Sequence, residues 1–542
     1  MRILILGLSL LCAVSAQAQR YTRNSVSVIH TSYNDKYDKA VDQYFDSYQP
    51  GARYDNNAID TKEIVLNASR ELYKETDNKR DYLVPNWENT LSRYTNNIGK
   101  EILSYLFSYD KKGYMDFYLL GERGLYNAND DDAILASAAK SGNALLRDAG
   151  SELLKNSYFI IYDIANIRYE YRTDLGDEKG EYYWLCTPVA YLYRIKWDDN
   201  MKNTFYESYW INEDDTPAEK ERKAALYKSL EVPVELVMKV SESSISKSAE
   251  VEKNKRENGK KNEETLVANA FRSMMSSATS GLEEEMEKKH SSFQLSNAIF
   301  ETHPIRVKIG KKEGIKSNNR FFVYETISKD GTATNTKEVR KGVVLASKQI
   351  ADNRTNASGQ TPSTVFYQIA GRKLAEGMTI REKKWIGMGL EAGYRYGENQ
   401  GVYIGATMSF IGGKVTNNTV LLNATIDNDA FNVALGYGYG LRINNFELYP
   451  YIGAGLDTFN KEKEDDSTKL SKEEDKESMK RSAWYALGGI RMNLNIYHPV
   501  QLFAGCEFDY RVWDGAEYNY YRIMKDRNID GFNVYGGIRV CF

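Results

Sequence analysis

The sequence of 542 residues is short of the features that mark several common classes of protein. Beyond its N-terminal segment it has no run of about 20 apolar residues, the length that a membrane-spanning helix needs, so any membrane contact must use strands. Its only histidines, His30, His290, His303 and His498, lack metal-ligand spacing, and no metal site is expected. No Gly-x-Ser-x-Gly, P-loop or dinucleotide motif occurs, so we predict no catalytic residue and no cofactor.

A strong net charge is also missing. The formal net charge of -3 and the pI near 6.1 leave no basic footprint for nucleic acid. One of the four cysteines lies in the N-terminal segment, and the other three, Cys186, Cys506 and Cys541, are an odd number that implies no disulfide framework. Cys186 stands among apolar residues of a strand-like segment, which predicts a buried, inert thiol rather than a nucleophile.

The first residues have the pattern of a secretory signal. Arg2 supplies the positive start, Ile3 to Val14 the apolar core, and Ala16-Gln17-Ala18 the small-residue cleavage site. We therefore expect residues 1–18 to be removed. Cys12 raises the alternative of a lipoprotein signal, but the apolar core continues past it, which favours ordinary cleavage.

Residues 384–542 alternate between apolar and polar side chains. In the last segment Phe532, Val534, Ile538, Val540 and Phe542 point one way, while the polar residues between them point the other. Eight such segments follow Trp385, with aromatic residues near their ends. A repeated pattern of this kind is typical of a membrane-spanning β-barrel.

Residues 385–542 resemble the OmpA/OmpX-type eight-stranded barrels of the outer-membrane β-barrel superfamily, including the terminal Phe542 that such proteins use as an assembly signal. The resemblance implies an outer-membrane location in a Gram-negative cell, with outer-membrane lipid around the barrel. Because both ends of an eight-stranded barrel lie on one side, the region before the barrel is expected in the periplasm.

A barrel of eight strands has room in its lumen only for side chains. The inward positions carry acids and bases, and we expect them to neutralise each other in a network that plugs the lumen. An ion pathway along these charges is the alternative. The predicted lumen network consists of Glu391, Arg395, Arg442, Glu447, Asp457, Arg491, Glu507, Asp509, Arg511 and Arg539.

The region before the barrel divides into three parts. We expect residues 19–240 to form an α+β domain, with helices at Asn89–Ser108 and Asp132–Lys155 covering one face of an antiparallel sheet. Its predicted strands are Tyr158–Arg172, Tyr182–Trp197 and Thr204–Ile211. Residues 241–300 are predicted to form a charged helical linker whose apolar stripe packs on its own domain or, alternatively, on a partner. Residues 301–383 are predicted to form a small β-barrel, which resembles SH3-like modules around Gly310 and Gly314.

Together these patterns predict a non-enzymatic outer-membrane protein, in which a plugged barrel holds a periplasmic binding or assembly scaffold. The expected partners are envelope proteins or the cell wall. Two alternatives stay open at this point: a small pore or transport component gated by the inward charges, and a periplasmic hydrolase with its site in residues 20–240. The oligomeric state is not predicted.

Overall fold

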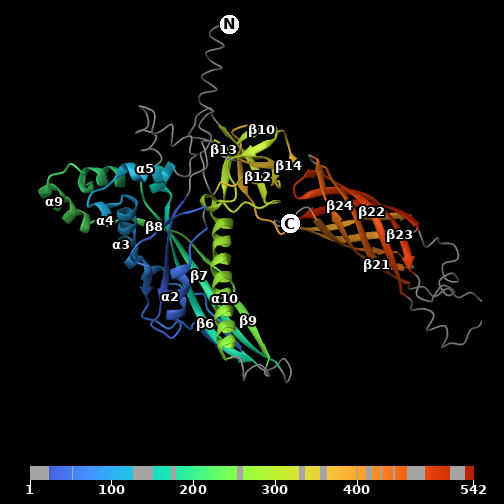
Figure 1. Cartoon of the computed structure of the whole chain (residues 1–542), viewed down its shortest axis with the longest axis horizontal. Helices are drawn as coiled ribbons and strands as arrows, with labels where there is room; N and C mark the ends of the chain where they lie inside the picture. The colour runs from blue at the N-terminus through green and yellow to red at the C-terminus, as the bar shows by residue number, and fades with distance from the viewer. Residues whose placement is uncertain are drawn as a thin grey trace, which may run out of the picture. The chain divides into compact units, whose positions relative to one another are not determined.

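A computed structural model gives the architecture of the chain (Figure 1). It describes residues 24–51, 53–77, 79–125, 150–172, 179–252, 260–328, 336–353, 363–397, 399–410, 418–427, 430–443, 446–459, 482–512 and 531–542. The predicted signal segment, the segments 460–481 and 514–530 within the predicted barrel region, and most of the predicted helix at 132–155 lie outside these residues. The described residues up to Leu295 form one compact unit, called the first unit below. The described residues from Ser296 onward form the second unit.

A mixed seven-stranded sheet is the centre of the first unit, in the order β2-β1-β6-β7-β8, with β3 paired to β1 and β9 paired to β7. The strands are β1 (Ser25–Ser32), β2 (Asp55–Asn57), β3 (Glu63–Val65), β6 (Ser157–Arg172), β7 (Lys179–Ile195), β8 (Val234–Ser241) and β9 (Ile245–Glu252). A separate hairpin consists of β4 (Tyr73–Thr76) and β5 (Lys79–Tyr82). The sheet is not purely antiparallel, because β1 runs parallel to β2, β3 and β6.

Helices cover both faces of this sheet, not one as predicted. Along β6, Phe159 and Ile161 face a core that includes helix α3 (Glu88–Leu106), while Ile160 and Tyr162 face a second core. The second core contains helices α2 (Asp38–Ser47) and α10 (Lys260–Lys289). A strand whose successive side chains are all buried needs cover on both sides.

Residues 241–300, expected as a charged helical linker, contribute β9 to the sheet and α10 to its second core. The apolar stripe of α10 is buried in its own unit, through Phe271, Met274, Met275, Ala278, Leu282 and Met286. The charged residues that dominate the sequence of this segment did not indicate how deeply the stripe is buried.

One predicted strand of this unit is wrong. Thr204–Ile211 is not extended: α8 (Asp199–Thr204) continues into a π-helical turn, η1 (Phe205–Tyr209). Asp198 caps α8 by accepting a hydrogen bond from the backbone N–H of Met201. Phe205 is fully buried, and helical packing of the aromatic residues in this turn overrides their strand propensity. The remaining short elements are α4 (Tyr109–Lys112), α5 (Phe117–Leu125), α9 (Pro217–Lys228) and η3 (Ser291–Phe293).

The second unit begins with a closed barrel in the order β10-β11-β14-β13-β12-β15. Its strands are β10 (Ser296–Thr302), β11 (Ile305–Val307), β12 (Arg320–Ser328), β13 (Thr336–Ala346), β14 (Thr364–Gly371) and β15 (Thr379–Glu382). A small β-barrel is therefore present where one was predicted. Its likeness to SH3 modules stays a prediction.

A second, larger barrel completes this unit, and it confirms the predicted eight strands. They are β16 (Met388–Gly397), β17 (Gly401–Ser409), β18 (Asn418–Ile426), β19 (Ala430–Tyr439), β21 (Phe446–Phe459), β22 (Ser482–Tyr497), β23 (Val500–Val512) and β24 (Gly531–Cys541). Short β20 (Leu441–Ile443) continues β19 past Gly440. All neighbours pair antiparallel, and the β19–β21 and β16–β24 pairings close the ring.

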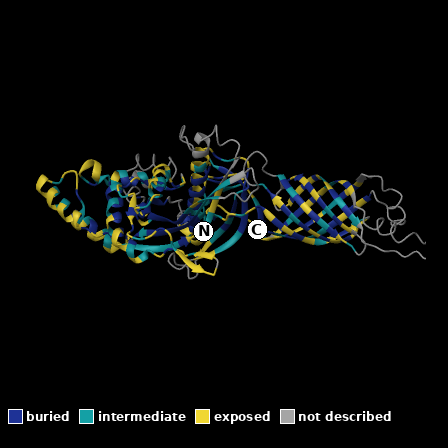
Figure 2. Ribbon diagram, turned by 90° about the horizontal axis from the view of Figure 1, so that it is seen from below, coloured by how far each residue is buried: buried dark blue, intermediate teal, exposed yellow. Residues whose placement is uncertain are grey.

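The predicted inward and outward faces of this barrel are also confirmed. Along β24, Phe532, Val534 and Ile538 are exposed, while Asn533 and Arg539 are buried. Figure 2 shows the resulting chequered band of exposed and buried residues around the barrel. Among the residues that the structure describes, no helix combines the length and apolar character needed to cross a membrane.

Candidate functional site

The lumen of the large barrel holds the charged residues that the sequence singled out. Eight of the ten have described side chains, and all eight are at most 4 % exposed: Glu391, Arg395, Glu447, Asp457, Arg491, Glu507, Asp509 and Arg539. For Arg442 and Arg511 the structure describes the backbone but not the side chain. Phe542, the predicted assembly signal, is exposed at the end of the last strand.

Two arginines organise these charges. Arg395 Nη2 lies 2.5 Å from both Glu507 Oε1 and Asp509 Oδ2, so one guanidinium joins two carboxylates. Arg491 donates two parallel hydrogen bonds to Glu391, of 2.8 and 2.6 Å. Such charge-assisted pairs offset the large desolvation cost of burying these ions.

The other charges extend the network along the lumen. Arg539 Nε lies 3.6 Å from Glu391 Oε1, and its Nη1 donates to Gln501 at 3.1 Å. Glu447 accepts a hydrogen bond from the Tyr449 hydroxyl at 2.8 Å. The buried groups are thus tied to neighbours on several strands, which favours a fixed filling over an open path.

Aromatic rings occupy the space between the charges. Tyr403 stacks on Tyr535 with centroids 5.3 Å apart, and the Tyr535 hydroxyl donates to Tyr451, which donates to Glu507 at 2.6 Å. A Cβ at Gly505 would lie 2.5 Å from the ring of Tyr535, so glycine is needed there to admit the ring. Aromatic side chains from β17, β21 and β24 therefore pack together inside the lumen.

The small barrel is joined to one end of the large barrel within the same compact unit. Asn318 Nδ2 donates to the backbone oxygen of Phe410 at 3.1 Å, and Trp385 Nε1 donates to the backbone oxygen of Asn318 at 2.9 Å. Arg320 Nη1 donates to His498 Nε2 at 2.7 Å, where His498 occupies the tight turn between β22 and β23. We call these five residues the seam.

Charge at the seam is set by burial. Burial lowers the pKa of Arg320 to about 10, so its guanidinium stays charged at neutral pH. Burial, with Arg320 and Arg340 nearby, lowers the pKa of His498 to about 4. The imidazole is therefore neutral at pH 7 and able to accept the bond from Arg320. A small cavity at the seam reaches Glu447, Arg539 and Cys541 at the end of the lumen.

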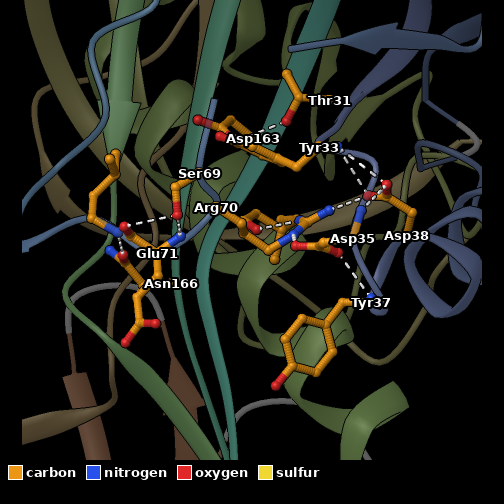
Figure 3. Close-up of polar contacts among 12 residues, drawn as sticks. Thr31, Tyr33, Asp35, Tyr37, Asp38, Ser69, Arg70, Glu71, Asp163 and Asn166 are labelled. Carbon is orange, nitrogen blue, oxygen red and sulfur yellow. Dashed lines mark hydrogen bonds and ion pairs between the residues drawn. The ribbon is translucent and has the colours of Figure 1, made fainter. Parts of the chain in front are cut away.

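A second buried polar network lies in the first unit (Figure 3). Arg70 pairs with Asp35 and Asp38 and donates to the backbone oxygen of Ile164 at 2.7 Å. Asp163 accepts hydrogen bonds from Thr31 and Tyr33 at 2.8 and 2.7 Å, and burial raises its pKa. This network connects strand β6 to the segment that follows β1. No sequence motif predicted this structural role.

The cysteines and histidines add two findings. The three described cysteines are free thiols, and Cys186 is buried as predicted. Burial raises the pKa of Cys186 to about 12, which is consistent with the predicted inert thiol. His30, Asp42 and Glu63, which have no recognisable spacing in sequence, bring donor atoms within 4.8 Å of one another. Only the pairing of distant elements unites them, so sequence reasoning missed this cluster.

Known proteins and families that resemble this chain include transmembrane β-barrels, and the similarity covers the C-terminal region. Residues 351–537 match the family model described as "Outer membrane protein beta-barrel domain". Similar solved structures include a major outer membrane protein from Thermus thermophilus (11% identity, 29% of this chain, 98% of that chain, TM-score 0.22). The N-terminal β-barrel domain of Pseudomonas aeruginosa OprF is another (13% identity, 30% and 100% covered, TM-score 0.20), as is a de novo designed transmembrane β-barrel (14% identity, 30% and 98%, TM-score 0.18). Among curated proteins, no sequence matches the chain.

Proposed function

We propose that the chain is an outer-membrane protein whose C-terminal barrel, the region that matches the outer membrane β-barrel family model, serves as a closed anchor for a periplasmic binding or assembly scaffold. The observation that carries the proposal is the filled lumen. Arg395 and Arg491 are almost completely buried and pair with carboxylates on other strands. A conducting barrel needs water where these side chains lie.

The seam supports the same conclusion. It joins the small barrel to the end of the lumen where Arg539 and Cys541 line the shared cavity. The start of β16 and the end of β24 pair at this end, since Gly389 lies opposite Cys541. In outer-membrane barrels both chain ends face the periplasm, which supports a periplasmic location for the seam and the first unit in this proposal.

The first unit also offers a surface for binding. Around the β4–β5 hairpin, Tyr73, Leu83 and Val84 are exposed large apolar side chains. Exposed apolar side chains so near one another in the chain make this hairpin a candidate for a protein-binding site. The N-terminal unit is therefore assigned the specific function, and the barrel its location. No enzymatic role is proposed.

Planar-bilayer recording of the full-length protein tests the closed anchor. We expect no steady conductance, with a 16-stranded porin from the same detergent as the positive control. Stable single-channel steps from the purified chain would overturn the closed lumen and favour the pore alternative.

Protease treatment of intact cells tests the orientation. Cleavage is expected only in the segments 460–481 and 514–530, which lie at the cell exterior in the proposed orientation. Cleavage within residues 20–380 on intact cells would place the first unit outside and contradict the proposal.

Site-specific photocrosslinking in cells tests the scaffold. A crosslinker at Leu83 is expected to capture envelope proteins or cell-wall material, whereas one at the similarly exposed Tyr367 of the small barrel serves as the matched control. Equal and featureless labelling at both positions would remove the support for a binding surface around the β4–β5 hairpin.

A further inference from the structure

Three potential metal ligands converge in the first unit. His30 lies on β1, Asp42 on α2, and Glu63 is the first residue of β3. Parallel pairing of β1 with β3 places His30 directly beside Glu63. His30 Nε2 lies 2.9 Å from Asp42 Oδ1, and one donor atom from each residue lies within 4.8 Å of the other two.

The imidazole is held in place by its surroundings. His30 is only 5 % exposed, and its ring stacks on Phe45 with centroids 4.8 Å apart and planes 4° from parallel. Phe45 is a core residue of α2, the helix that also carries Asp42. The same helix therefore fixes the ring and supplies the carboxylate that faces it. A pre-positioned donor of this kind reduces the entropy lost when a ligand binds.

The charges of the cluster favour a cation. Two carboxylates close to one imidazole repel each other unless positive charge lies between them. The neighbouring Lys62 lies 3.6 Å from Asp46, on the outer part of α2, and so already has an acidic partner. A divalent cation among the three donors would neutralise both Asp42 and Glu63.

We propose that His30, Asp42 and Glu63 form a binding site for a divalent transition-metal ion, with Zn²⁺ as the preferred occupant. One imidazole nitrogen with carboxylate oxygens suits zinc, whereas calcium and magnesium favour oxygen ligands alone. Donors bound to one tetrahedral zinc lie about 3.3 Å apart, given bond lengths of about 2.0–2.2 Å. Asp42 and Glu63 are exposed enough to rotate into that geometry around the fixed ring.

The site has three protein ligands and an outer side open to solvent. A fourth position would therefore hold water, as in zinc sites that keep an exchangeable ligand. Binding would link α2 to β1 and β3. The proposal is independent of the barrel's role as an anchor.

Zinc titration of the full-length chain without a histidine tag, in detergent and against a chromophoric chelator, tests the site. We expect one Zn²⁺ per chain. Asp42→Asn and Glu63→Gln are each expected to weaken binding about tenfold or more, since even outer-shell partners of a metal are worth about 10- to 100-fold. Asp46→Asn, on the same helix but outside the cluster, is the matched control and should bind as the unaltered protein does.

X-ray absorption of the zinc-loaded protein gives a readout independent of affinity. Nitrogen and oxygen ligands with an imidazole signature are expected. Sulfur ligation would assign the zinc to a cysteine and overturn the proposal. So would the absence of saturable binding, unchanged affinity in both Asp42→Asn and Glu63→Gln, or an equal loss in Asp46→Asn, which would reduce the cluster to a His30–Asp42 hydrogen bond.

Discussion

The second unit contains two closed barrels with opposite interiors. In the small barrel the core is apolar, and Phe321, Val323 and Val344, which share one face of the β12–β13 pair, are fully buried. In the large barrel the interior holds Arg395 and Arg491, and the apolar side chains face outward. Closing a sheet satisfies the backbone in both cases, so backbone hydrogen bonding does not set the polarity of the inside.

The surrounding medium accounts for the difference. Around the small barrel water takes the polar face, and burial of apolar side chains stabilises the fold. In the proposed outer-membrane location, lipid covers the apolar outer face of the large barrel, which leaves the interior to polar groups that must satisfy one another. The interior of the large barrel is therefore held by specific partners, and that of the small barrel by non-directional packing.

Loss of a central ion in the large barrel should have the largest effect. Arg395→Met removes the guanidinium between Glu507 and Asp509, and the two uncompensated carboxylates should cost about 5 kcal/mol. The loss of unfolding free energy is measured by denaturant titration in detergent, with the heat-dependent gel mobility of the barrel reporting the folded fraction.

The matching control neutralises the carboxylates as well. Addition of Glu507→Gln and Asp509→Asn to Arg395→Met should restore most of the lost stability. If the triple variant is no more stable than Arg395→Met alone, packing rather than charge holds the lumen, and the contrast between the barrels fails.

Loss of volume should be the most damaging change in the small barrel. Phe321→Ala leaves a cavity in a fully buried site and should cost about 3–4 kcal/mol of unfolding free energy. Exposed Tyr367→Ala is the control in the same barrel and should change stability by less than about 0.5 kcal/mol. A comparable loss for both variants would mean that the core of this barrel is not packed as described.

The sequence could predict which residues face the interior of the large barrel, but not which of them pair there. The alternation around Val534, Asn533 and Arg539 depends on period two alone, so the faces of the large barrel could be assigned residue by residue. The pairing of each acid with its base in the lumen could not be predicted from the sequence. Arg491 meets Glu391 and Arg395 meets Glu507 across about a hundred residues of sequence, and only the closed ring brings them together.

The same limit explains what was missed or wrong in the first unit. Thr204–Ile211 has the composition of a strand, but buried packing of Phe205 favours a helical turn. His30, Asp42 and Glu63 belong to three elements, and their proximity follows from the pairing of β1 with β3. The seam between Arg320 and His498 is likewise a tertiary contact that no local pattern encodes.

The stability cost of a charge on the outer face of each barrel should show whether lipid or water surrounds that face. Ile452→Arg, near the middle of β21, places a cation on the exposed outer face and should cost about 2–4 kcal/mol if lipid surrounds that face as proposed. Ile327→Arg makes the same change on the exposed face of the small barrel and should cost less than about 0.5 kcal/mol. Folding into lipid vesicles measures both. An equal effect would show that the medium does not distinguish the two barrels.

Acid should act at the seam, where the two barrels meet. The pKa of His498 is about 4 in the folded chain and near 6.5 when unfolded, so between these values the unfolded state binds more protons. Stability should therefore fall as the pH drops from 6.5 to 4, by about 1–2 kcal/mol after allowance for the ring's partial exposure. His498→Gln keeps an acceptor for Arg320 but cannot be protonated, so the difference between the two proteins isolates this group. If both lose stability equally across that range, the acid sensitivity comes from carboxylates elsewhere, and the neutral imidazole is not what holds Arg320 at the junction.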